Sequence, residues 1–156
     1  MTLAGRVQPG RDDGNAIIEF VFVAILVLVP LVYLIVAVAV VQRSRLATTN
    51  AARDVGRAVA TADRLAEAPA RAQAALRIAL ANQGLRPPDV QLRFVGVGAD
   101  CQAGSDQQPT LAAGAEFRVC VIRHQRLPAV PGVLAGRGII TIGQYVVHVD
   151  DFRPSR

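Results

Sequence analysis

The sequence predicts an α+β fold in which one long amino-terminal helix precedes a second, short helix and a small three-stranded antiparallel sheet. Three observations predict it. An uncharged apolar run extends from Phe20 to Val41, and helical periodicity continues behind it to residue 84. From Asp89 onward, apolar residues alternate with polar ones, as in half-buried strands. Because the helices precede the strands, the two kinds of element segregate within the fold.

The apolar run is long enough to span a membrane. No charged residue lies between Glu19 and Arg43. A helix from Phe20 to Val41 would rise roughly 33 Å, against a hydrocarbon core of ~30 Å. Residues 1–14 are rich in glycine, arginine and aspartate and predict a leader without stable structure. We therefore expect a leader at 1–14 and a transmembrane helix at 15–41.

Two residues distinguish this helix from a simple anchor. Glu19 is an ionisable residue at the start of the apolar run, and such residues in membrane segments are functional by default. Pro30 lies in the middle of the run and leaves the carbonyl of Leu26 without its helical partner, which predicts a kink. The alternative is a proline that a membrane helix simply tolerates.

Behind the membrane segment, residues 42–84 predict an extracytoplasmic helical region. Small or apolar residues recur there at spacings of three, four and seven, which places them on one helical face; they are Val41, Thr48, Ala52, Val55, Val59, Ala62 and Ala66. Pro69 suits the first turn of a second helix that ends near Gly84. Arginines lie mostly off the apolar face, so we expect them to be solvated.

Residues 85–152 predict a small β-rich head packed on the membrane-distal part of the first helix. The alternating residues of the first two strands are Val90, Leu92 and Phe94, then Phe117, Val119 and Val121. A third strand begins near residue 139, and residues 99–115 form an exposed loop. Residues 153–156 are expected to be a loose tail.

Cys101 and Cys120 are the only cysteines. They lie outside any CxxC spacing and follow a membrane segment, which favours a structural disulfide outside the cytoplasm. Such a bond would close a loop of about 20 residues and stabilise the head by about 3 kcal/mol in the chain-entropy model.

No catalytic, cofactor or metal site is predicted, so we do not expect an enzyme. A two-histidine metal site can be drawn from His124, His148 and Asp150-Asp151, but the spacing matches no metal-binding motif. No serine lies in a nucleophile motif, and no glycine group forms a phosphate-binding turn. The formal net charge is +5, but the arginines are dispersed, which argues against a nucleic-acid partner.

The segment from Gly14 to Phe20, GNAIIEF, resembles the processing site of type IV prepilins, in which a peptidase cuts after glycine and leaves glutamate as the fifth mature residue. Further matching segments are Val29-Pro30-Leu31-Val32-Tyr33, Ala51-Ala52-Arg53-Asp54-Val55-Gly56-Arg57-Ala58 and the carboxy-terminal Asp151-Phe152-Arg153. Together they are similar to the TadE-like minor pilins, or pseudopilins, of actinobacterial tight-adherence pilus systems. One departure is Asn15, where pilins often carry an apolar or methylated first residue.

The resemblance implies a pilin-like fold and a role in assembling a surface pilus. It implies cleavage between Gly14 and Asn15, and subunit assembly through Glu19 and Phe20, with Glu19 meeting the new amino terminus of a neighbouring subunit. The implied partners are membrane lipid, a prepilin peptidase, other pilins and pilus-assembly membrane proteins, in a homo- or hetero-oligomer. The implied location is the cell membrane or a surface pilus.

Two other functional classes remain open, and the arginine distribution conflicts with the expected membrane topology. The chain could be a single-pass membrane protein with an extracytoplasmic binding domain outside any fibre, or a secreted domain released near Ala39. The arginines at 43, 45, 53 and 57 outnumber those at 6 and 11, so the positive-inside rule would put the head in the cytoplasm. A cytoplasmic peptidase requires Gly14 inside, and we therefore expect the amino terminus in the cytoplasm and the head outside it.

Overall fold

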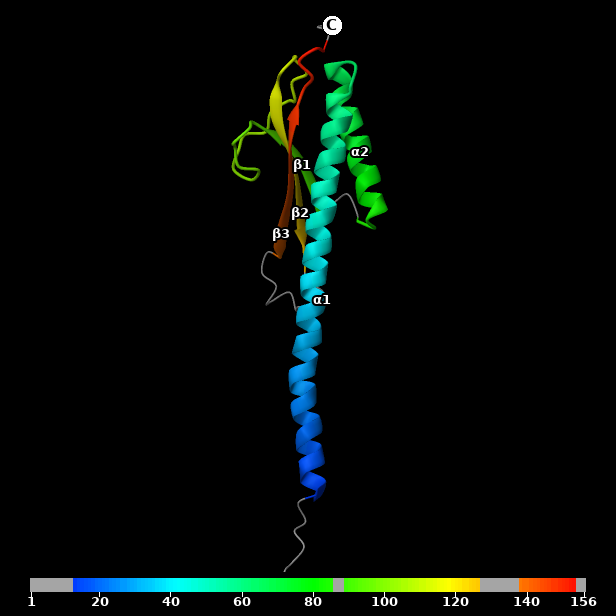
Figure 1. The fold of residues 1–156 in the computed structure, drawn as a ribbon, viewed down its shortest axis with the longest axis vertical. Helices are drawn as coiled ribbons and strands as arrows, with labels where there is room; N and C mark the ends of the chain where they lie inside the picture. The colour runs from blue at the N-terminus through cyan, green and yellow to red at the C-terminus, as the bar shows by residue number, and fades with distance from the viewer. Residues whose placement is uncertain (1–12, 86–88, 127–137, 154–156) are drawn as a thin grey trace, which may run out of the picture. The chain divides into compact units, whose positions relative to one another are not determined.

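The computed structural model describes residues 13–85, 89–126 and 138–153 (Figure 1). Its elements are helix α1 (Asp13–Ala60), a short 3-10 helix η1 (Leu65–Glu67), helix α2 (Ala68–Asn82) and strands β1 (Val90–Val95), β2 (Glu116–Gln125) and β3 (Ile139–His148). The predicted α+β class, with two helices followed by a three-stranded antiparallel sheet, is confirmed. The chain divides into two compact units, Met1–Val38 and Ala39–Arg156, and each is described separately.

Within the described part of the first unit, the chain is entirely α-helical and carries its apolar side chains on the surface. The helix begins at Asp13, inside the predicted leader. It is long and apolar enough to cross a membrane. The second unit, which we call the head, contains the carboxy-terminal part of α1, both shorter helices and the sheet.

The predicted small-residue face of the first helix forms the centre of the head. Thr48, Ala52, Val55 and Val59 are all fully buried. Ala66, the last residue of the predicted face, is instead exposed, because α1 ends at Ala60 and the chain has turned before that position. The helical period of the sequence therefore continues beyond the actual end of the first helix.

A turn follows α1 and leads directly into α2. Arg71 holds this turn by donating to the carbonyl of Thr61 at 3.1 Å and to the carboxylate of Asp63 at 3.1 Å. The expected proline, Pro69, lies in the first turn of α2. The helix ends at Asn82, close to the predicted end marker Gly84, whose φ of 65° is the left-handed conformation that glycine adopts most easily.

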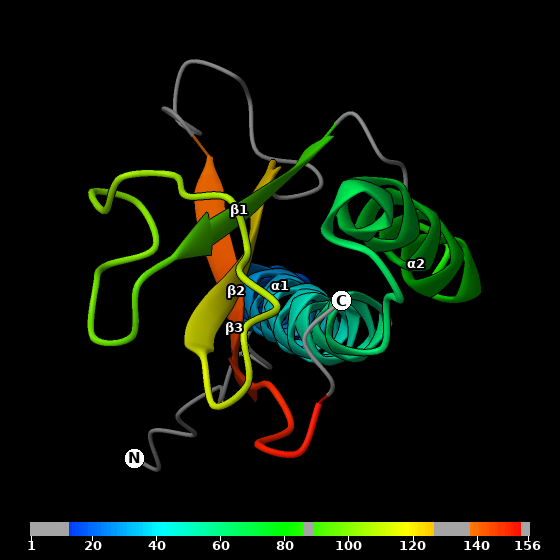
Figure 2. The same cartoon turned by 90° about the horizontal axis from the view of Figure 1, so that it is seen from above.

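The three strands form an antiparallel sheet in the order β1-β2-β3, and α1 and α2 lie on one face of it (Figure 2). The predicted alternation is confirmed in β2, where Phe117, Val119 and Val121 face the helices. Cys120 and Ile122 point to the other face and are also buried, in a second cluster with Val95 and Cys101. The central strand is therefore covered on both sides.

Glycines allow the sheet to approach α1 closely. A Cβ atom on Gly143 of β3 would lie 2.1 Å from the backbone carbon of Thr48. On the helix side of the same interface, a Cβ on Gly56 of α1 would lie 2.7 Å from a methyl group of Val147 and 2.8 Å from the ring of Tyr145, both in β3. Because helix backbone and strand backbone meet at Gly143, this contact has no flexible side chain that could move aside.

We expect the substitution Gly143→Ala to destabilise the head by about 1–3 kcal/mol, the usual cost of overpacking a well-packed core. Chemical denaturation of the full chain in detergent, followed by circular dichroism, measures the loss. Gly96→Ala is the matched control, since its Cβ would meet only a side-chain oxygen of Gln107 at 3.9 Å. Equal stability of the two variants would contradict the close approach.

Candidate functional site

The predicted processing and assembly residues all lie in the first two turns of α1. The bond between Gly14 and Asn15 lies in the first turn, and Glu19 and Phe20 lie in the second. Glu19 is exposed, and 74% of the surface of Phe20 is accessible. None of the ion pairs found among the described residues involves Glu19.

Behind Glu19 the surface of α1 is apolar on all sides. The large apolar side chains from Ile17 to Val38 are between 45% and 74% exposed. A helix that packs on a soluble core is apolar along one stripe, whereas a helix apolar all round is buried in protein or membrane. Among the described residues this segment is therefore a candidate membrane span by its length and composition.

Pro30 interrupts the hydrogen bonding of this segment without ending the helix. Proline has no N–H, so the carbonyl of Leu26 lacks its partner four residues on. α1 is nevertheless assigned as one helix from Asp13 to Ala60. Local melting at Pro30 is therefore absent from the described structure, and a bend there stays a prediction.

The predicted disulfide between Cys101 and Cys120 is present, with an S–S distance of 2.02 Å and a Cα–Cα distance of 5.7 Å. It fixes the loop between β1 and β2 to the outer face of the sheet. Both cysteines are buried with Val95 and Ile122. The bond therefore completes the second cluster of the head.

Arginines hold the same loop, contrary to the expectation that the arginines are mainly solvated. Arg93 donates to the carbonyls of Cys101 at 2.8 Å and Gln102 at 2.7 Å. Arg118 donates to the carbonyl of Ala99 at 2.8 Å. The sequence does not predict such contacts, because an arginine that binds a backbone carbonyl occupies the same kind of position in a strand as a solvated arginine.

Asp100 organises the turn that precedes the disulfide loop. Its Oδ1 accepts hydrogen bonds from the backbone N–H of Gln102 at 2.7 Å and of Ala103 at 2.8 Å. These bonds, led by that of Ala103, lower the pKa of Asp100 below its usual value. The carboxylate thus stabilises the turn in its ionised form.

The expected loose tail is also partly fixed. Arg153 donates to the carbonyl of Ala60 at 2.7 Å and to that of Ala62, at the carboxy-terminal end of α1. A cation at this position suits the negative end of the helix dipole. Residues 154–156 lie outside the described residues, and Phe152 is 93% exposed.

The two histidines lie far apart, so the metal site considered from the sequence does not assemble. His148 is paired with Glu116 in the sheet register, whereas His124 lies eight residues further along β2. At ~3.4 Å per residue this separates them by about 27 Å. His148 instead contacts the carboxylates of Glu116 at 3.3 Å and Asp151 at 3.4 Å.

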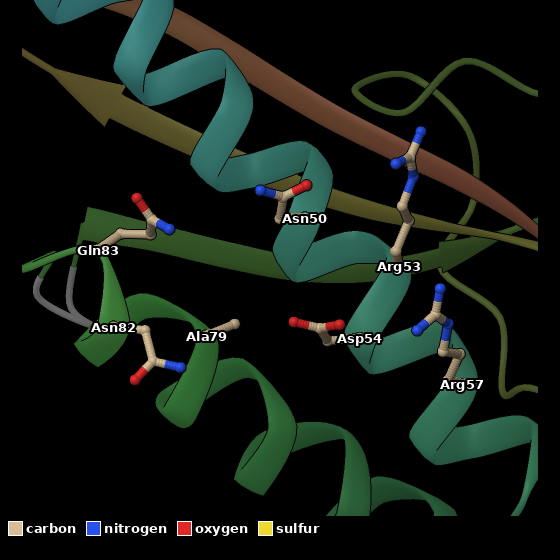
Figure 3. A pocket seen from close by; sticks show the side chains of 7 residues that line it. All are labelled: Asn50, Arg53, Asp54, Arg57, Ala79, Asn82 and Gln83. Atoms are coloured by element: carbon tan, nitrogen blue, oxygen red, sulfur yellow. The ribbon is translucent and has the colours of Figure 1, made fainter.

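A polar groove lies between α1 and α2 in the head (Figure 3). Its volume is about 260 Å³. The residues that line it are Asn50, Arg53, Asp54, Arg57, Ala79, Asn82 and Gln83. Asp54 points toward α2, whereas Arg53 and Arg57 point away from it (Figure 3). Six of its seven lining residues are polar or charged.

We expect a pH-dependent contribution to head stability from His148. Its hydrogen bonds with Asp151 and Glu116 raise its pKa above the ordinary value of about 6.5. The stabilising effect is therefore fully present below the unfolded pKa and is lost as pH rises through the folded pKa. An NMR titration of the His148 ring measures the raised value.

In the double variant Glu116→Gln, Asp151→Asn, the pKa of His148 should fall toward about 6.5. His148→Gln should remove the part of the pH dependence of the free energy of unfolding that comes from this histidine. A His148 titration that is the same in the wild type and the double variant would refute the role of the two carboxylates.

Comparison of the chain with protein-family models, with curated proteins and with solved structures found no match.

Proposed function

We propose that this chain is a minor pilin or pseudopilin that acts in assembly of a type IV-like, tight-adherence surface pilus. It is made as a membrane-held precursor with its amino terminus in the cytoplasm, and a prepilin peptidase cleaves it after Gly14. Its role is structural rather than catalytic, and its partners are lipid, the peptidase, other pilins and membrane proteins of the assembly machinery.

The observation that supports the proposal is that the two parts of α1 differ in the burial of their apolar side chains. The amino-terminal part of the helix exposes apolar side chains on all sides, whereas the carboxy-terminal part supplies the buried Ala52, Val55 and Val59 of the head. One continuous helix therefore joins a membrane-length apolar segment to a separately packed domain. This arrangement suits a subunit that is first stored in a bilayer and then packed through the same apolar surface against other helices.

The position of Glu19 adds a chemical argument. Cleavage after Gly14 would create a free amino group on Asn15, four residues before Glu19. In a helix this four-residue spacing places the amino group of Asn15 and the carboxylate of Glu19 of the same chain on one face, about 6 Å apart along the axis. A carboxylate in an apolar surround is costly unless it is paired. Pairing with the amino terminus of a neighbouring subunit would remove that cost and fix the register between subunits.

The proposal predicts a mature chain that begins at Asn15. Mass spectrometry of the membrane-associated protein, made with its pilus peptidase, should find this species as the main form. Gly14→Leu should leave the full-length precursor, because the residue before the cut must fit the peptidase site. Gly10→Leu, a matched change in the same leader, should still be cleaved.

A full-length wild-type chain in the presence of active peptidase would contradict the proposal. Cleavage that is unaffected by Gly14→Leu would contradict it equally. The fifth mature residue can be tested in the same system: Glu19→Gln should be cleaved but should fail to join the assembled fibre or machinery.

A second candidate is a secreted domain released near Ala39. It is favoured by one observation, that the compact head unit begins at Ala39. Against it, α1 continues through this position without a break. A soluble mature form that begins at Val40 would support the released domain. An uncleaved chain that remains in the membrane would instead support an anchored binding protein outside any fibre.

A further inference from the structure

The carboxy-terminal turn of the head, residues 150–153, is held in place by several hydrogen bonds. The backbone N–H of Arg153 donates to the carbonyl of Asp150 at 3.2 Å, and the backbone N–H of Phe152 donates to the carboxylate of Asp150 at 2.9 Å. The side chain of Arg153 reaches the carboxy-terminal end of α1, beside which the turn lies (Figure 1). The turn thereby holds Phe152 at the surface, where 93% of this residue is exposed.

His148 joins this turn to the sheet. Its Nδ1 lies 3.3 Å from Glu116 Oε1, and its Nε2 lies 3.4 Å from Asp151 Oδ2. Glu116 begins β2 and is paired with His148 in the sheet register, whereas Asp151 belongs to the carboxy-terminal turn. One imidazole ring therefore contacts two carboxylates that come from different segments of the head.

The hydrogen-bonding capacity of the imidazole ring decides when both contacts can form. An ionised carboxylate only accepts hydrogen bonds, so each of the two ring nitrogens must carry a proton. Both nitrogens are protonated only in the imidazolium, because the neutral ring has one N–H and one lone pair. The neutral ring can therefore donate to one carboxylate, while its lone pair faces the other carboxylate and repels it.

The other charged groups near the ring are engaged elsewhere. His148 points to the face of the sheet that lies away from α1 and α2. On this face of β2, the guanidinium of Arg118 donates to a backbone carbonyl of the disulfide loop at 2.8 Å. The carboxylate of Asp150 accepts from the backbone of its own turn. Asp151 and then Glu116 are thus the groups that raise the pKa of His148 above its ordinary value.

We propose that His148 is a pH-operated latch of the carboxy-terminal turn: the imidazolium holds the turn to the sheet through Asp151, and the neutral ring keeps Glu116 and releases Asp151. Glu116 is the contact that remains because the β2–β3 ladder places it opposite His148, whereas Asp151 lies beyond the end of β3. The latch is closed below the pKa of the folded state and opens as pH rises through it. It therefore controls how firmly the head holds the exposed Phe152.

Glu116→Gln is the most discriminating variant. The amide NH₂ of glutamine can donate to the Nδ1 lone pair of a neutral ring, which leaves the Nε2–H to donate to Asp151. Loss of charge alone would loosen the turn, whereas the latch predicts that the turn now stays held at high pH. His124→Gln is the control, because His124 is the other histidine and lies exposed near the opposite end of β2.

NMR of the full chain in detergent tests the latch at pH values about two units below and above the titration midpoint of the His148 ring. Amide protection factors of Phe152 and Arg153, corrected for the intrinsic pH dependence of exchange, report on the turn. We expect them to fall about two- to fivefold above the midpoint, the range that an exposed ion pair allows. The Val149 amide, which donates to a carbonyl next to β2, should keep its protection.

The nitrogen chemical shifts of the ring give the tautomer above the midpoint. We expect Nδ1–H in the wild type, which donates to Glu116, and Nε2–H in Glu116→Gln, which donates to Asp151. A wild-type ring in the Nε2–H form would overturn the proposal, because that ring would keep Asp151.

Loss of protection that occurs in the wild type and in His124→Gln, but not in Glu116→Gln, supports the latch. Wild-type protection that does not change with pH overturns it, as does an unchanged pH dependence in Glu116→Gln. Low protection of Glu116→Gln at both pH values overturns it as well, because loss of charge alone would explain that result. None of these readouts requires cleavage at Gly14 or a pilus, so they are independent of the proposed function.

Discussion

The apolar surface of the amino-terminal part of α1 is the constraint on which the rest of the structure depends. Seventeen large apolar side chains between Ile17 and Val38 are exposed. Removing such side chains from water is favourable, so their exposure favours a segment that is covered by lipid or by other chains. By length and composition the segment is a candidate membrane span.

Helix α1 belongs to both parts of the chain, because its amino-terminal half is the apolar segment and its carboxy-terminal part supplies the core of the head. Alanine, valine and glycine on α1 allow the sheet to pack closely, with Gly143 meeting the backbone of Thr48. Long arginines and one disulfide then fix the loops around this contact. A small domain cannot bury as large a share of its surface as a large one, and such cross-links compensate. The sheet and α2 thus pack against the carboxy-terminal part of α1 within the head.

Features with a regular period could be predicted from the sequence, and contacts between distant residues could not. The helical face of Thr48 to Val59 and the alternation of Phe117, Val119 and Val121 follow from the repeat of each element. The exposure of Ala66 and the anchoring of Arg153 to the end of α1 depend on where the chain turns. No local pattern encodes that turn.

The functional residues divide in the same way. Gly14, Glu19, Pro30 and the two cysteines stand out in the sequence because of their type and place. The contacts of Arg93 and Arg118 with the carbonyls of the disulfide loop do not, because nothing in the sequence distinguishes these arginines from solvated ones.

The membrane attachment and orientation of the chain are central to the account, since the arginine count alone favours the opposite topology. They can be measured in one experiment on cells that express the full chain. Membranes washed with alkaline carbonate should retain the protein, and protease added to intact spheroplasts should digest the head. Release of the chain by carbonate, or a head that stays protected until the spheroplasts are lysed, would contradict the account.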